Sequence, residues 1–76
     1  MQNEVFVPLP YKVEPGDVIL DSQLKEHSEL YSDLKAFCEQ SFTDKFELDK
    51  TIYARGIRVL TDSHVDVDRL TEWLDN

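Results

Sequence analysis

One short segment of the sequence combines residue types that bind metal ions. Asp62, His64, Asp66 and Asp68 alternate along the chain, and alternate residues of an extended segment point to the same side. Imidazole and carboxylate groups are ordinary ligands of divalent cations. The segment has neither the glycine nor the closing glutamate of an EF-hand loop, and helix capping explains the same residues. We therefore expect Asp66 to be a helix N-cap, Asp68 to lie in the first turn, and no metal or other cofactor to be bound.

The single cysteine, Cys38, is the other candidate for chemistry. A nucleophilic thiol needs a base within hydrogen-bond reach, but His27 precedes Cys38 by eleven residues, or about 16 Å along a helix. The only glycines, Gly16 and Gly56, form no phosphate-binding loop. We expect Cys38 to be a core thiol and His27 to be packed and hydrogen-bonded. The sequence predicts a protein that is not an enzyme.

The charge of the chain restricts its partners. Its 76 residues include 16 acidic and 8 basic ones, so the formal net charge is −8. Proteins that bind nucleic acids or anionic membranes need clustered Lys and Arg, so we expect neither as a direct partner. A lone cysteine excludes an internal disulfide, and the sequence shows no signal peptide or apolar stretch of membrane-spanning length. These features predict a cytoplasmic protein.

The first part of the chain has the pattern of an edge strand followed by a turn. In residues 4–14, apolar residues expected to face the core alternate with residues expected to face outward, and both prolines are among the outward-facing ones. This pattern is typical of a strand at a sheet edge. Residues 14–17 fit a type II turn with Gly16 at its third position. Residues 18–20 are too few to assign, and are either a return strand or the approach to a helix.

The main helix is predicted from residue 21 or 22 to about residue 41, with Asp21 or Ser22 as its N-cap. Three acids, Glu26, Glu29 and Asp33, lie opposite its apolar arc. That arc consists of Leu20, Leu24, His27, Leu30, Tyr31, Leu34, Cys38 and Phe42.

A hairpin and a short helix complete the expected fold. Residues 46–48 and 51–60 have strand character, residues 49–50 suit a turn, and a change of phase at Gly56 predicts a β-bulge. A helix over residues 66–74 is expected to bury Val67, Leu70, Trp73 and Leu74. The order β-(β)-α-β-β-α predicts one small α+β domain over residues 1–76. Its mainly antiparallel sheet would have three or four strands, with two helices packed on one face.

The placement of the acids suggests a function. They concentrate on the two helices and the loops before them, whereas residues 45–60 are net basic. The three acids of the main helix follow one another at about 4.5 and 6 Å along its axis, on the order of the ~3.4 Å phosphate spacing of a DNA strand. We therefore expect a non-enzymatic inhibitor that mimics nucleic acid and occupies the basic site of a larger nucleic-acid-binding protein. This hypothesis follows an analogy of size and charge with small acidic proteins of phages and mobile elements. The expected contact residues are Glu26, Glu29, Asp33, Asp62, Asp66, Asp68 and Glu72.

A solvated helix face in an acidic protein has the same acidic rows, so a second hypothesis stays open. In it the protein is a structural or adaptor subunit, or a homodimer, that binds through exposed aromatics or a β edge. Candidates are Phe6, Phe37 and one of Ile52 and Tyr53. We expect Trp73 to pack at the core edge against the main helix; the alternative is an exposed interface anchor.

Overall fold

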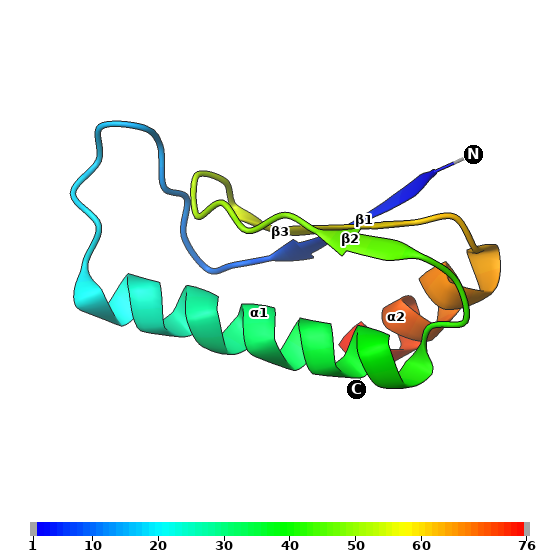
Figure 1. Ribbon diagram of the computed structural model, residues 1–76. Coiled ribbons are helices and arrows are strands. Elements are labelled where there is room, and N and C mark those ends of the chain that lie inside the picture. The colour runs from blue at the N-terminus through cyan, green and yellow to red at the C-terminus, as the bar shows by residue number, and fades with distance from the viewer. Residues whose placement is uncertain (1, 76) are drawn as a thin grey trace.

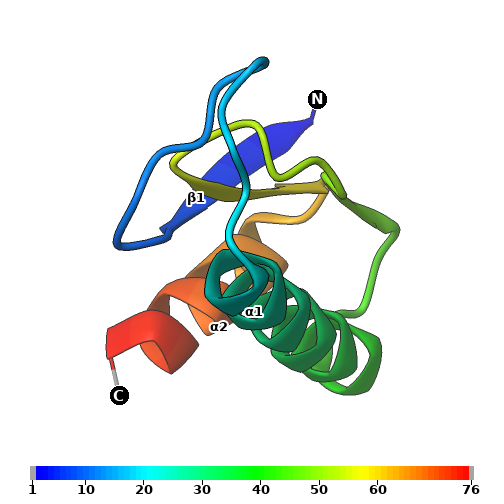
Figure 2. The same cartoon turned by 90° about the vertical axis from the view of Figure 1, so that its left-hand side faces the viewer.

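The computed structural model describes residues 2–75 as two layers, a β-sheet and a pair of helices (Figure 1). Along the chain the elements are β1 (Asn3–Pro8), α1 (Asp21–Ser41), β2 (Phe46–Leu48), β3 (Gly56–Thr61) and α2 (His64–Asp75). Both helices lie against the same face of the sheet (Figure 2). The predicted α+β class is confirmed. Because residues 18–20 form no strand, the sheet has three strands and the order is β-α-β-β-α.

β3 is the central strand and pairs antiparallel with β1 on one side and β2 on the other. The prediction of β1 as an edge strand is confirmed, although the strand ends at Pro8 and not near residue 14. The alternation continues beyond the strand, because Val13 is buried and Leu9 half-buried while Pro10 and Lys12 are exposed. Gly16 has φ +97°, and the Asp17 N–H donates to the Glu14 carbonyl at 3.0 Å, which confirms the predicted turn.

The hairpin differs from the prediction, because β3 begins at Gly56 and the loop before it spans residues 49–55. The carboxylate of Asp49 accounts for this longer loop. One of its oxygens accepts a hydrogen bond from the Thr51 N–H at 3.0 Å, and the other accepts two from the Arg58 guanidinium, at 2.8 and 3.1 Å. The predicted bulge is wrong, since the β1–β3 register is uninterrupted from Thr61 to Gly56, which lies opposite Pro8.

α1 has the predicted length, but its N-cap is Leu20 and neither Asp21 nor Ser22. The amide oxygen of Gln23 accepts the Leu20 N–H at 3.0 Å and so satisfies a free donor at the helix start. The first turn extends past the sheet (Figure 1), which leaves Leu20 57% and Leu24 49% exposed. The start of the predicted apolar arc is therefore not covered.

The core lies between the sheet and the two helices. Phe42, Phe46 and Trp73 pack around it, half-buried. Leu70 is buried as predicted, but Leu74 is 38% exposed at the margin of α2. Neither helix within residues 2–75 has the length and apolar character needed to cross a bilayer. The buried residues of this core cluster are Val7, Leu34, Cys38, Ile57, Val59 and Leu70.

Candidate binding surface on the helix layer

The helix layer contains most of the negative charge of the protein. α1 has five acidic and two basic residues and α2 has four acidic and one basic residue, so each helix has a net charge of −3. Together the helices account for six of the eight excess negative charges. Because both helices lie on one face of the sheet, this charge is concentrated on one side of the molecule, apart from Asp66, whose carboxylate is buried.

The three acids predicted on the main helix are exposed. Glu26, Glu29 and Asp33 lie within about 60° of one another around α1. Within residues 2–75, the ion pairs join Lys12 to Glu14 and Arg58 to both Glu4 and Asp49. No acid of α1 is therefore neutralised by an ion pair among these residues.

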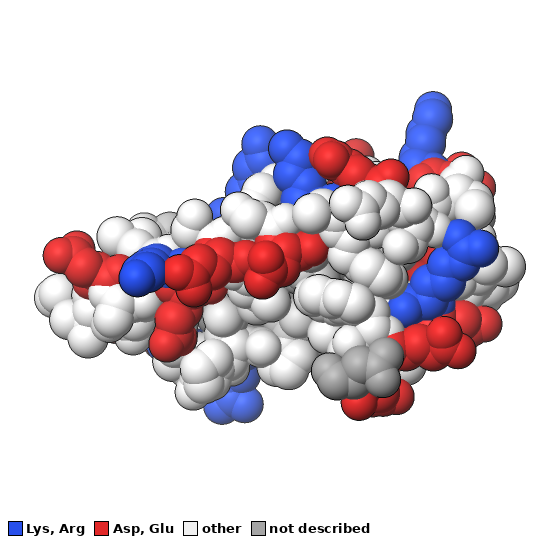
Figure 3. All heavy atoms as spheres, turned by 90° about the horizontal axis from the view of Figure 1, so that it is seen from below, with Lys and Arg blue, Asp and Glu red and all other residues white. Residues whose placement is uncertain are grey.

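The acidic side chains of the two helices do not form one continuous surface. Seen from the helix side, they gather in two groups, one along α1 and the other on α2, separated by a stretch of mainly uncharged surface, with Lys or Arg atoms beside the α2 group (Figure 3). Three of the predicted contact residues lie on or near α2 and are exposed. Asp68 and Glu72 belong to the helix, and Asp62 lies in the loop before it. Asp75, which was not among the predicted residues, is exposed on the same helix.

Asp66 does not belong to this surface, and its predicted role as an N-cap is wrong. α2 begins at His64, so Asp66 lies within its first turn and is completely buried. Its carboxylate accepts hydrogen bonds from the N–H groups of Thr43 and Asp44 and from the Thr43 hydroxyl, at 3.0 to 3.2 Å. The residue that precedes α2, Ser63, accepts the Asp66 N–H instead, at 3.4 Å. Asp66 therefore binds the α1–β2 loop and is not available to a partner.

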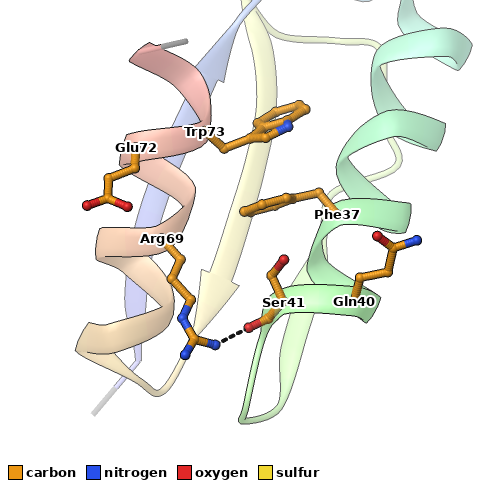
Figure 4. Close-up of a pocket in the computed structure, with 6 residues that line it drawn as sticks. All are labelled: Phe37, Gln40, Ser41, Arg69, Glu72 and Trp73. Atoms are coloured by element: carbon orange, nitrogen blue, oxygen red, sulfur yellow. Dashed lines mark hydrogen bonds between the residues drawn. The ribbon is translucent and has the colours of Figure 1, made fainter.

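A groove of about 340 Å³ separates the C-terminal halves of the two helices (Figure 4). Its centre is an aromatic pair, Phe37 of α1 and Trp73 of α2, whose rings stack with centroids 5.1 Å apart and planes inclined by 20°. Both rings are half-buried. Trp73 therefore packs against the main helix as predicted, but one side of the pair borders the groove.

Polar side chains line the rest of the groove. The guanidinium of Arg69 donates a hydrogen bond to the main-chain carbonyl of Ser41, the last residue of α1, and is held there (Figure 4). Gln40 and Glu72 complete the lining from the two helices. Sequence periodicity did not predict this groove, because its walls come from helices about 30 residues apart in the chain. One feature of the sequence could have indicated that α2 packs beside the end of α1. Asp66 lies on the same helical stripe as Leu70 and Trp73, so its carboxylate needs buried partners.

Cys38 and His27, the two residues considered for nucleophilic chemistry, are both buried and packed in the interior. Cys38 is completely enclosed in the core. Burial, reinforced by the negative charges of Asp66 and Glu39, raises the pKa of the Cys38 thiol to about 11. The Nε2 of buried His27 is hydrogen-bonded to the Thr51 carbonyl at 3.1 Å. Both residues pack as predicted.

The segment considered for metal binding is divided between surface and interior. Asp62, His64 and Asp68 are exposed, whereas the Asp66 carboxylate is engaged by the main chain of the α1–β2 loop. Among residues 2–75, no group of three or more His, Cys, Asp or Glu side chains is arranged to hold a metal ion.

Comparison of the chain with protein-family models, with curated proteins and with solved structures finds no match. The chemistry of the helix layer is therefore the basis on which a function can be assigned. This layer presents unpaired carboxylates on either side of an aromatic groove. Such a surface can attract cationic groups and enclose an apolar side chain.

Proposed function

We propose that this protein is a non-enzymatic inhibitor whose helix layer occupies the basic site of a larger nucleic-acid-binding protein. The observation that carries the proposal is the concentration of acidic residues on the helix layer, where the net charge is −3 on each helix and every acid except the buried Asp66 is exposed. In this layer, Glu26, Glu29 and Asp33 are exposed on a helix of 21 residues.

A rigid helix is a suitable scaffold for charge mimicry. The three carboxylates project from one side of α1 at steps of about 4.5 and 6 Å along its axis. A basic groove that accepts phosphates at comparable intervals would be attracted to this row over a range set by the Debye length, about 8 Å at physiological salt. Such attraction accelerates encounter and favours partners with a positive surface.

A second candidate function is that of an adaptor subunit that binds through the sheet. Both β1 and β2 are edge strands with a free side, and an edge strand can pair with a strand of another chain. Phe6 on β1 is 45% exposed and Tyr53, in the loop before β3, is 50% exposed. Binding through these residues would depend weakly on salt.

The two candidates are separated by charge reversal in the helix layer. The test variant replaces Glu26, Glu29 and Asp33 with Lys, and the control variant replaces Glu4, Glu14 and Glu47, which are exposed outside the helices, with Lys. Both variants change the net charge equally. The control loses only exposed ion pairs, each worth about 1 kcal/mol or less.

Each protein is immobilised and exposed to lysate of its native host, with and without DNA as a competitor. We expect wild type and control to retain a DNA-binding protein that added DNA releases, and the test variant to retain none. Retention by the folded test variant at the wild-type level, insensitive to salt and DNA, would overturn the proposal and favour the adaptor function.

A further inference from the structure

We infer that the groove between α1 and α2 receives an apolar side chain from a Lys- and Arg-rich segment of the partner. This inference rests on the proposed function. It adds to the charge contacts an apolar contact, made by a side chain of the partner's basic segment. The groove lies between the helices, on the side of the molecule that also holds the two acidic groups (Figures 3 and 4). An apolar centre with a charged rim is the usual arrangement of a protein-binding hot spot.

The aromatic pair forms a firm base for the groove. Phe37 stacks on Trp73 and also meets Phe42 edge to face, with ring centroids 6.2 Å apart. Phe42 in turn meets Phe46 at 5.4 Å. These contacts restrain the two groove rings before a partner arrives, so little side-chain entropy is lost on binding.

The charges around the groove determine which segment fits. Asp33 lies one helical turn before Phe37 on α1, and Glu72 lines the groove from α2. The Asp33 carboxylate favours Lys or Arg beside the inserted apolar residue, and the Glu72 carboxylate, directed away from the aromatic pair (Figure 4), adds attraction at longer range. Arg69 is the exception, but one of its donors is committed to the Ser41 carbonyl. Its remaining N–H groups can donate to a main-chain carbonyl of the bound segment.

A second copy of this chain fits the groove less well. Phe6 is the exposed aromatic of the sheet, and Arg58 lies opposite it on β3. However, Arg58 is already paired with Asp49 at 2.8 Å and with Glu4 at 3.7 Å. The sheet therefore offers no free positive charge beside Phe6, and two copies that each have a net charge of −8 repel one another.

The inference can be tested with two synthetic peptides that differ in one side chain. Both alternate Lys and Ala, and the central residue is Phe in one and Ala in the other, so their charges are equal. Trp73 is the only tryptophan, and its fluorescence reports groove occupancy. We expect the Phe peptide to bind about tenfold more tightly than the Ala peptide and alone to shift the Trp73 emission.

A matched pair of variants identifies the groove as the binding place. Gln40→Phe adds a bulky ring at an exposed residue that lines the groove, whereas Gln2→Phe makes the same substitution before β1, far along the chain. We expect Gln40→Phe to lower the affinity for the Phe peptide to that for the Ala peptide, and Gln2→Phe to leave it unchanged. Equal affinities of the two peptides for the wild-type protein would overturn the inference.

The charge-reversed variant at Glu26, Glu29 and Asp33 separates this inference from the proposed function. If the peptides bind equally and this variant weakens both, the groove inference fails and the charge-based function stands. If the Phe peptide is still preferred but charge reversal changes neither affinity, the proposed function fails. A wild-type dimer in sedimentation that Gln40→Phe converts to monomer would make a second copy the occupant and overturn the inference.

Discussion

The buried carboxylate of Asp66 in α2 accepts the main-chain N–H of Thr43, 3.0 Å away in the loop that follows α1. The same carboxylate accepts the Asp44 N–H and the Thr43 hydroxyl. Three residues later in α2, Arg69 donates to the Ser41 carbonyl. These contacts join the first half of α2 to the end of α1, and they set the separation of the two helices that form the groove.

Replacing Asp66 with Ala is expected to destabilise the protein by about 3 kcal/mol, because it leaves buried donors without an acceptor. Asp66→Asn keeps one side-chain oxygen and should cost less. The free energy of unfolding in urea measures both effects. Asp68→Ala, at an exposed position of the same helix, is the control and should change stability by about 0.5 kcal/mol or less. Equal losses at the two positions would contradict the role of Asp66.

Gly56→Ala should disrupt the pairing of β1 with β3. A Cβ at this position would lie 2.0 Å from the Val7 carbonyl oxygen and 2.7 Å from the Cα of Pro8. Since both are main-chain atoms, the strands must separate, and we expect a loss of about 3 kcal/mol or more in urea unfolding. Gly16→Ala is the comparison, because it meets no atom within 4 Å but has positive φ. It should cost about 1–2 kcal/mol, and a larger loss there than at Gly56 would contradict this argument.

Trp73→Ala is expected to cost about 3 kcal/mol, since it removes the stacked partner of Phe37 at the edge of the core. Trp73→Phe preserves an aromatic face and should cost about 1.5 kcal/mol or less. Thermal or urea unfolding measures both. If Trp73→Ala unfolds at the wild-type denaturant concentration, Trp73 contributes contact surface and not stability.

Cys38 should resist thiol reagents while the protein is folded. Its pKa is raised to about 11 because burial and the neighbouring carboxylates disfavour the thiolate. At pH 8, well below this pKa, only on the order of 0.1% of the thiol is ionised, and reaction requires the thiolate. We expect labelling by a chromogenic disulfide to follow the rate of unfolding, and to become fast in urea. Rapid labelling of the native protein would show that the thiol is accessible.

Much of this fold is determined by local sequence patterns. Leu34 and Cys38 are four residues apart, and this spacing places apolar side chains on one face of a helix. Val5 and Val7 are two residues apart, and this spacing places them on one face of a strand. The existence of α1 and β1 could therefore be predicted from the sequence. The row of acids on α1 was equally predictable, because its members lie within two turns of one helix.

Contacts between distant segments decided the rest. Asp66 is of a residue type that often caps helices, and it precedes an apolar helical stripe. However, α2 begins two residues before it, at His64, and the α1–β2 loop encloses its carboxylate. Likewise, Phe37 and Trp73 each belong to a local apolar stripe, and only the packing of α2 beside α1 stacks them and opens the groove. Local periodicity predicted that both helices and the three strands form, because it depends on residues close in the chain, and the composition fixes the total charge. The arrangement of the acids in two groups around an aromatic groove could not be predicted, because the crossing of the two helices depends on contacts throughout the core.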